Sequence, residues 1–240
     1  MAKRGGVVKE ERAIFRHELK YEISYSEKEL QIARMKEILH MDPHAGSTGY
    51  MIRSLYFDDY WNSAYEEKLI GTVSRKKYRI RIYDFSDKVI KLECKNKQGN
   101  YIYKESANLV REEVERILSG DYAFLLQREE AICHRFYVAC MSDLLRPKVI
   151  VDYDRVPYIY DVGTVRVTFD MHVRAGLGSF DLFDCNIPMA ETMQGDRLIM
   201  EVKYTECLPQ IVKNILPQES GEYTSASKYC MCYDKKMSLM

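Results

Sequence analysis

The sequence predicts an α+β protein, built as an antiparallel sheet with helices packed against it. Several short segments alternate charged and apolar residues, at residues 16–22, 79–82, 91–97 and 201–204. Because successive side chains of a strand point to opposite faces, this pattern is typical of strands. The predicted strands follow one another through short turns, which favours antiparallel pairing. Stretches with apolar residues three or four positions apart predict helices between them.

The length of 240 residues suits one large domain with enough chain to bury a hydrophobic core. We expect a disordered lead-in over residues 1–11 and a single domain over residues 12–240, because no repeat, linker or low-complexity tract divides the rest. Hydrophobic residues make up 46% of the chain and charged residues 30%, which is close to the average of globular proteins. The 19 tyrosines are ascribed mostly to strand propensity.

In the first half, turn and capping residues bound the predicted elements. Ser26 and Glu29 have the spacing of a capping box and predict a helix that runs to about Met41, with Leu30 facing inward. Turns are expected at residues 86–88, within a hairpin, and at residues 98–100. The predicted strands are residues 15–25, 51–58, 78–85, 89–97 and 101–106, with a short strand or helical turn at 65–70 and a loop at 42–47.

The second half begins with two predicted helices. The first covers residues 108–119 and is ended by Gly120, and the second covers residues 123–145. Strands follow at 148–153, with 158–160 as a possible continuation, and at 165–173 and 197–204. Short helices are expected at 208–216 and 224–236.

One face of the predicted sheet carries charged side chains of both signs. Its members are Arg16, Glu18, Lys20, Glu22, Arg79, Arg81, Lys91, Glu93, Lys95, Lys97, Lys104, Arg166, Asp170, Glu201 and Lys203. This face must contact water, since Lys, Arg and Glu are almost never buried unpaired. Two interpretations stay open. Alternation alone favours the solvated side of a half-exposed sheet, and the other interpretation is the wall of a wet cavity.

The balance of charge on this face bears on that choice. Lys+Arg and Asp+Glu both number 36, so the formal net charge is zero and any anion site must come from local sorting of charge. On the alternating face, however, Arg and Lys dominate, and Glu18, Glu93 and Glu201 recur once per strand. Clustered cations suit a phosphate chain, and sparse carboxylates suit Mg²⁺ or Mn²⁺. Strands closed into a barrel would place these groups inside a tunnel.

Eight short motifs, in this order along the chain, resemble the VTC domain, the polyphosphate polymerase branch of the tunnel-shaped triphosphate metalloenzymes. They lie at residues 16–21, 54–58, 78–83, 92–95, 152–155, 165–170, 200–203 and 227–229. The resemblance covers about residues 14–235. It implies an eight-stranded antiparallel β-tunnel, or barrel, flanked by helices.

The resemblance also implies an activity, in which the γ-phosphate of ATP is transferred to a growing polyphosphate chain with Mn²⁺ or Mg²⁺ as cofactor. Since the terminal phosphate of the acceptor attacks in line, no side-chain nucleophile is needed. The implied catalytic residues are Arg79, Arg81, Lys95 and Glu201. Glu201 would hold the metal, with Glu18 and Glu93 as weaker candidates. The triphosphate and the product chain would be bound by Lys20, Lys68, Lys104, Arg155, Arg166, Lys203 and Lys228.

Two departures from the family pattern keep alternatives open. Lys68 stands where the polymerases carry Arg, and Ser225 stands where they carry a further Lys. The alternatives are a hydrolase that cleaves triphosphate or polyphosphate in the same tunnel, and a polyphosphate- or nucleotide-binding module with little turnover. For all enzymatic interpretations, replacing Glu201 by Gln is expected to abolish metal-dependent activity and to leave the fold intact.

The remaining features favour a soluble, cytoplasmic protein. Seven cysteines, an odd number without a C-x-x-C pair, indicate reduced thiols. We see no signal peptide and no run of transmembrane length. The basic pair at residues 235–236 is too short to indicate a nucleic-acid patch, so ATP and polyphosphate are the expected partners.

Overall fold

The computed structural model describes residues 15–99, 101–193, 195–217 and 222–240, and the predicted lead-in at residues 1–11 lies outside them. The described residues form a sheet of 11 strands in the order β11-β1-β10-β8-β7-β3-β4-β5-β6, with β2 paired to β7 and β9 paired to β8. The strands are β1 (His17–Ser24), β2 (His40–Met41), β3 (Tyr50–Asp58), β4 (Ser74–Tyr83), β5 (Ser86–Gln98), β6 (Tyr101–Leu109), β7 (Arg146–Tyr160), β8 (Val165–Gly176), β9 (Met189–Glu191), β10 (Arg197–Tyr204) and β11 (Glu222–Tyr223). The helices are α1 (Tyr25–Met35), α2 (Ser63–Ile70), α3 (Arg111–Ser119), α4 (Ala131–Ser142), α5 (Gln210–Ile215) and α6 (Lys228–Met237).

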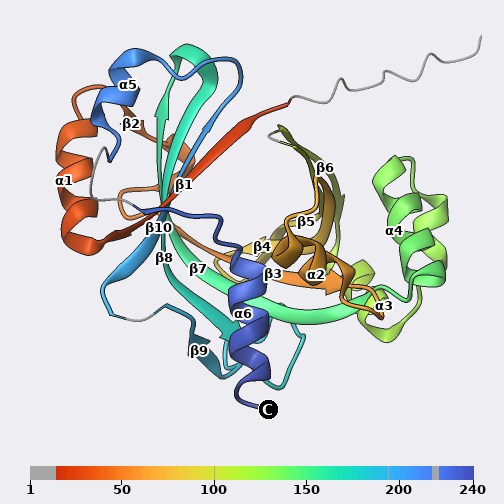
Figure 1. The fold of residues 1–240 in the computed structure, drawn as a ribbon. Helices are drawn as coiled ribbons and strands as arrows, with labels where there is room; N and C mark the ends of the chain where they lie inside the picture. Colours follow the sequence, from red (N-terminus) through yellow and green to blue (C-terminus); the bar gives the residue numbers. More distant parts are fainter. Residues whose placement is uncertain (1–14, 100, 194, 218–221) are drawn as a thin grey trace, which may run out of the picture.

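The sheet is strongly curled, so that its two ends approach each other (Figure 1). At one point β6 meets the start of β1, because Arg16 and Ile102 exchange two backbone hydrogen bonds of 2.9 and 3.1 Å. Every strand pair in the sheet is antiparallel, and eight long strands surround the interior. The predicted α+β fold with an eight-stranded antiparallel, tunnel-like sheet is therefore confirmed. Among the described residues, β6 and the start of β1 are joined only by this bridge, so the sheet is curled but not closed.

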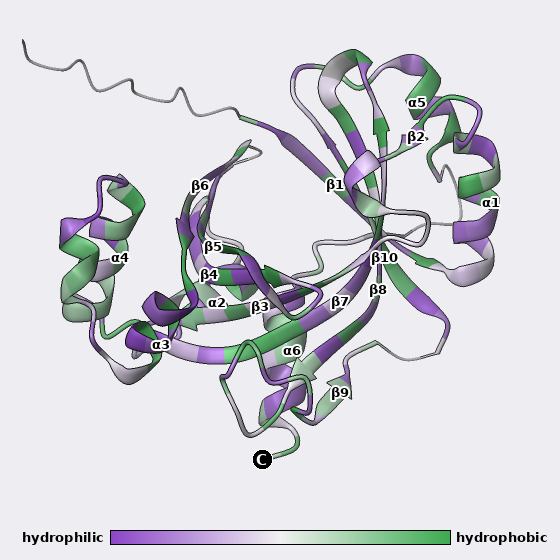
Figure 2. Cartoon of the chain, turned by 180° about the vertical axis from the view of Figure 1, so that it is seen from behind, coloured by the Kyte–Doolittle hydropathy of each residue, from purple (hydrophilic) through white to green (hydrophobic). Residues whose placement is uncertain are grey.

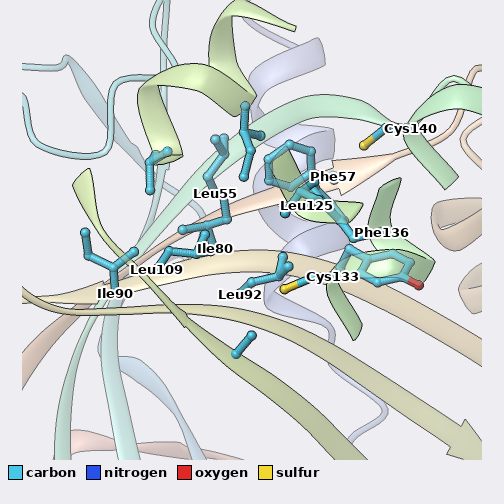
Figure 3. Packing of buried hydrophobic residues seen from close by; sticks show 14 of the residues in the cluster. Leu55, Phe57, Ile80, Ile90, Leu92, Leu109, Leu125, Cys133, Phe136 and Cys140 are labelled. Atoms are coloured by element: carbon cyan, nitrogen blue, oxygen red, sulfur yellow. The ribbon is translucent and has the colours of Figure 1, made fainter. Parts of the chain in front are cut away.

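The apolar core lies mostly on the outside of this curl. Hydrophilic and hydrophobic residues alternate along the long strands (Figure 2). On one flank, the outer faces of β3 to β6 pack against α3, α4 and the 3₁₀ turn Ala123–Gln127, with Phe57 against Phe136 at the centre (Figure 3). On the other flank, β1, β8 and β10 pack against α1 and α5. Because the helices bury the outer faces, the inner face is free to be polar.

Helix α6 is different, since it packs along β7 and β8 beside the interior (Figure 1). Its residues Tyr229 and Cys232 are buried against Ile52 and Ile199. Asp58, at the end of β3, accepts hydrogen bonds from the Tyr229 hydroxyl at 2.7 Å and from the Ala64 amide at the start of α2 at 2.9 Å. This one carboxylate therefore fixes α2 and α6 relative to the sheet.

The prediction for the first helix was wrong at both ends, since α1 ends at Met35 and the predicted end near Met41 lies in β2. The capping box is formed by Ser24 and Glu27, two residues earlier than predicted: the Glu27 amide donates to Ser24 Oγ at 3.1 Å and the Ser24 amide donates to the Glu27 carboxylate at 2.6 Å. The pair Ser26 and Glu29 has the same spacing but lies inside the helix. Leu30, which was predicted to face inward, is 50% exposed.

Two other boundaries also differ from the predictions. The β4–β5 hairpin turns at Asp84 and Phe85, both at positive φ, so the predicted turn residues 86–88 belong to β5. The predicted helix 123–145 is broken into the 3₁₀ turn and α4. At the break, the Arg128 guanidinium binds the carboxylates of Glu113 and Glu130, and these contacts stabilise the non-helical connection. The segment at 65–70 is helical, as part of α2.

Candidate functional site

The inner face of the sheet surrounds a cavity of about 410 Å³. It is lined by residues of β1, β3, β4, β5, β6, β7 and β10, by α2, and by residues 224–229, which run into the first turn of α6. Of the residues that the structure describes, eleven cationic side chains line it, against two carboxylates, Glu18 and Glu201. The cations are Lys20, Lys68, Arg75, Lys77, Arg79, Arg81, Lys95, Lys97, Arg155, Lys203 and Lys228. A neutral protein has therefore concentrated positive charge in one cavity.

The period of two explains how one strand supplies four of these cations. In β4, Arg75, Lys77, Arg79 and Arg81 point to the same side, and the residues between them include Tyr78 and Ile80, which are buried in the outer core. The β5 neighbours continue the pattern, since Lys95 pairs with Lys77 and is inward as well.

Glu201 is the centre of charge compensation in the cavity. It is 4% exposed, and its oxygens lie 2.7 Å from Lys203 Nζ, 2.8 Å from Lys228 Nζ, 3.4 Å from Lys20 Nζ and 3.6 Å from an Arg155 Nη atom. Burial opposes the ionisation of Glu201, but these four cations outweigh it and hold the pKa of this carboxyl well below its usual range. Glu201 is therefore an ionised counter-ion for four cations.

A second carboxylate lies directly beside it. Asp170, on β8, is fully buried and accepts two hydrogen bonds from Arg155, at 2.6 and 2.7 Å. Its Oδ2 also lies 2.5 Å from Lys228 Nζ. Arg155 and Lys228 are thus held by Asp170 and Glu201 together, which fixes both cations in the wall.

Glu93 organises the arginines of β4. Its side chain is inaccessible to solvent, and it accepts hydrogen bonds from Arg79 at 2.7 Å and from Lys104 at 2.6 Å, with Arg81 at 3.8 Å. Burial raises the pKa of Glu93, but Arg81, Arg79 and Lys104 together bring it well below the usual value. Arg79 also donates to the Tyr56 hydroxyl at 2.8 Å, so its guanidinium is held from two sides.

Burial lowers the pKa of four lysines of the cavity, Lys68, Lys77, Lys95 and Lys97. Burial, together with nearby cations that include Lys20, lowers the pKa of both Lys77 and Lys95 to about 8. The Glu18 carboxylate accepts a 2.7 Å hydrogen bond from Lys95 and opposes this decrease, but it does not restore the pKa of Lys95 to its ordinary value. The cavity therefore holds more positive charge than its own carboxylates neutralise, which is the condition for binding an anion.

Glu18 and Glu201 are the carboxylates that suit a divalent metal. They face the cavity from neighbouring strands, and Lys203 Nζ lies 3.4 Å from Glu18 Oε1 and 2.7 Å from Glu201 Oε2. Glu18 Oε1 is buried and accepts no hydrogen bond from the residues that the structure describes. Two oxygen ligands supplemented by phosphate oxygens and water suit Mg²⁺ or Mn²⁺. In the described part of the chain, no group of three or more His, Cys, Asp or Glu side chains could hold a metal on its own.

The structure brings together most of the residues predicted from the sequence. The cavity is lined by Lys20, Lys68, Arg79, Arg81, Lys95, Arg155, Lys203 and Lys228, with Glu18 and Glu201. Three predicted residues are not part of the lining. Glu93 and Lys104 are paired with each other, and Arg166 donates to Asp42 at 2.7 Å and to the Tyr50 hydroxyl at 3.0 Å.

The cavity also contains residues that the sequence prediction missed. Arg75 and Lys77 share the parity of Arg79, but the strand was predicted to begin only at Tyr78. Period-two counting from Arg81 back to Arg75 could have found them. Tyr56, Tyr153 and Tyr229 line the cavity too, although the tyrosines had been ascribed mostly to strand propensity.

The family of the chain follows from its sequence profile. The profile of the VTC domain matches residues 15–236. The chain belongs to the VTC domain family. The curated proteins include no significant match to it. The family and the fold together support a tunnel-type module that binds nucleotides or phosphates.

Some solved structures are similar to this chain at low sequence identity. Two are bacterial proteins, each called a "putative adenylate cyclase". The one from Bacillus halodurans is 13% identical, with a TM-score of 0.50 over 86% of this chain and 95% of its own. The one from Vibrio parahaemolyticus is 9% identical, with a TM-score of 0.49 over 95% of this chain and 99% of its own. Within the described residues, no helix has the length and apolarity needed to span a bilayer.

Proposed function

We propose that this VTC-domain protein is a metal-dependent polyphosphate polymerase that transfers the γ-phosphate of ATP to a growing polyphosphate chain inside the cavity. The observation that carries the proposal is the excess of eleven lining cations over the four carboxylates that pair with them, Glu18, Glu93, Asp170 and Glu201. Arg and Lys are the side chains that bind phosphate oxygens most strongly. The expected partners are ATP and polyphosphate, and the expected cofactor is Mn²⁺ or Mg²⁺.

The length of the cationic row supports a polymerase over an enzyme that only holds a triphosphate. Arg75 and Arg81 are six residues apart on β4, which corresponds to about 20 Å along a strand. Lys68, Arg75 and Lys97 continue the row beyond Lys77 and Lys95. This is longer than a single triphosphate, so the row has space for both a donor triphosphate and an acceptor chain.

Catalysis then consists of positioning and charge neutralisation. Arg79 is held by Glu93 and Tyr56, and Arg81 donates to the hydroxyls of Ser54 and Tyr153. Both arginines would bind the oxygens of the phosphate that is transferred. Lys95 and Lys77 would bind the neighbouring phosphates as point charges. The terminal phosphate of the acceptor chain attacks in line, and the bond from the γ-phosphate to ADP breaks. Glu93 serves in this proposal as a structural counter-ion, because both of its oxygens are already engaged.

Glu18 and Glu201 would hold the divalent metal. When bound, the metal would neutralise charge that develops on the phosphate oxygens. Lys203 lies between these two carboxylates in the structure, and we propose that it is released toward the phosphates when a metal takes its place. Lys104 and Arg166 are proposed to act from outside the lining, Lys104 by holding Glu93 and Arg166 by binding phosphates near Tyr50.

The test is to incubate the protein with ATP and Mn²⁺ and to resolve polyphosphate, free phosphate and ADP. The proposal predicts polyphosphate together with ADP, and a loss of both in an Arg79→Met variant. Free phosphate without polymer would instead establish the hydrolase, in which water replaces the acceptor. Binding of ATP without turnover would establish a binding module. Lys91→Met is a matched control, since Lys91 lies on the neighbouring strand but does not line the cavity.

A further inference from the structure

A second cavity adjoins the cationic one at the rim of the sheet. It has a volume of about 830 Å³ and is lined by the outer face of β1, the end of β10, and α5 with its flanking residues. Three residues line both cavities, namely His17, Leu19 and Tyr204. We call this second cavity the α5 groove. A ligand that crosses this shared rim would occupy both spaces at once.

The α5 groove has a different chemical character from the cationic cavity. Among the described residues, its lining includes one cation, Lys213, and one carboxylate, Glu206. The rest of its lining is aromatic, amide or apolar: His17, Tyr21, Tyr204, Gln210, Asn214, Leu19, Cys207, Leu208, Leu216 and Pro217. Apolar and aromatic walls with a few polar groups are typical of sites for small organic molecules. The charged end of a ligand would thus favour the first cavity and an uncharged ring would favour the groove.

The shared rim carries a stacked aromatic pair. His17 and Tyr204 are direct partners in the β1–β10 ladder, and their rings lie 5.0 Å apart with an interplanar angle of 23°. Tyr101, across the point where β6 meets β1, has its ring 5.4 Å from that of His17 and is 52% exposed. An aromatic surface of this kind can stack a planar base whatever its hydrogen-bonding pattern.

The chain connects this aromatic pair directly to the phosphate-binding groups. Tyr204 follows Lys203, and His17 precedes Glu18, so adjacent residues face opposite sides of the same strands. Lys203 and Glu18 face the cationic cavity at the position where the two spaces meet. Only one residue of strand separates a proposed phosphate ligand from the aromatic rim.

We propose that the α5 groove binds the nucleoside of a nucleoside triphosphate, with the base against the His17–Tyr204 pair and the triphosphate extending into the cationic cavity. This rests on the proposed function, and it adds that the donor is recognised by its base as well as by its phosphates. The donor would thus occupy both spaces, with its base in the α5 groove and its phosphates beside the acceptor in the cationic cavity. A polyphosphate chain has no base, so it uses the cationic cavity alone.

The test compares two ligands on one variant. Tyr204→Leu keeps an apolar side chain in a position that packs against the β1–β10 core, but removes the ring. ATP and inorganic tripolyphosphate are titrated into the protein by calorimetry without divalent metal. We expect ATP affinity to fall at least about fivefold, the lower end of the effect of one base–aromatic stack, and tripolyphosphate affinity to stay within about twofold. Tyr60→Leu is the control, because Tyr60 is 64% exposed and lines neither cavity.

The outcomes separate this inference from the proposed function. If the variant lost affinity equally for both ligands, or for neither, the proposed base site would be overturned. Binding of tripolyphosphate to the unmodified protein would in that case still support the cationic cavity. Failure of the unmodified protein to bind either ligand would overturn both proposals. If Tyr204→Leu does not fold, Asn214→Trp fills the groove from an exposed position on α5 and must show the same selective loss of ATP binding.

Discussion

Replacing Glu201 by Gln should destabilise the empty protein strongly, although the substitution hardly changes the size of the side chain. The carboxylate is 4% exposed and lies within 4 Å of four cations, Lys20, Lys203, Lys228 and Arg155. Removing one partner of a buried ion pair costs about 3–5 kcal/mol, because the remaining charge stays buried without compensation. For a chain of this size that corresponds to a fall in Tm of roughly 6–20 °C. The expectation that the fold would remain intact is therefore revised.

The same variant should be stabilised by ligand more than the unmodified protein is. Its cavity has one negative charge fewer, so tripolyphosphate replaces a counter-ion that the neutral amide side chain cannot provide. We expect the Tm of Glu201→Gln to rise more on adding tripolyphosphate, in the presence of a chelator, than the Tm of the unmodified protein. Thermal unfolding followed by circular dichroism with and without ligand measures both effects.

A matched control separates the buried site from charge removal in general. Glu22 lies on β1 two residues from Lys20, but its side chain is 34% exposed and its contact to Arg197 is 3.7 Å long. Such an exposed pair contributes about 0–1 kcal/mol, so Glu22→Gln should unfold close to the unmodified protein. The reasoning would be refuted if Glu201→Gln and Glu22→Gln had the same Tm. It would also be refuted if tripolyphosphate raised the Tm of Glu201→Gln no more than that of the unmodified protein.

Three further predictions concern binding. Bound phosphate should raise the pKa values of Lys77 and Lys95 from about 8, so the protein takes up protons when it binds tripolyphosphate. The affinity for tripolyphosphate, measured by calorimetry, should therefore fall as the pH rises from about 7 to about 9.5. A constant affinity over this range would contradict the prediction. Lys203→Met should tighten Mn²⁺ binding several-fold in the absence of nucleotide, because the Lys203 ammonium no longer competes with the metal for the two carboxylates of the cavity. Weaker or equal Mn²⁺ binding in electron paramagnetic resonance titrations would rule out this competition. Arg79→Lys should weaken tripolyphosphate binding by about 1.5–3 kcal/mol, since the substitution removes the planar guanidinium with its paired donors. Lys91→Met should leave the binding free energy unchanged. Equal effects of the two substitutions would show that Arg79 does not bind the phosphates.

The sequence predicted the strands well because their charged face has a strict period of two. Glu18, Lys20, Arg79, Lys95 and Glu201 were all predicted to share this face, and all of them lie in the cavity lining. Alternation could not decide whether this face meets bulk water or a cavity, because that depends on the curl of the whole sheet. The curl is set by contacts between distant segments, such as the bridge from Arg16 to Ile102.

Local signals failed where two segments satisfied the same rule. Ser24–Glu27 and Ser26–Glu29 have the same capping spacing, and only the point where β1 ends selects the first. The tyrosines of the cavity could not be predicted, because the residues that pack together there are far apart in the sequence. Tyr56 and Tyr229 stack on each other with ring centroids 5.2 Å apart, yet they are 173 positions apart in the sequence, so no local pattern connects them.

The most direct test of the account is a crystal structure of the protein with tripolyphosphate and Mn²⁺, with the metal located by its anomalous scattering. The account predicts a phosphate chain inside the cavity, contacting Arg79, Arg81 and Lys95, and Mn²⁺ bound by Glu18 and Glu201 with Lys203 displaced. A phosphate chain bound outside this cavity, or Mn²⁺ bound away from these two carboxylates, would contradict it.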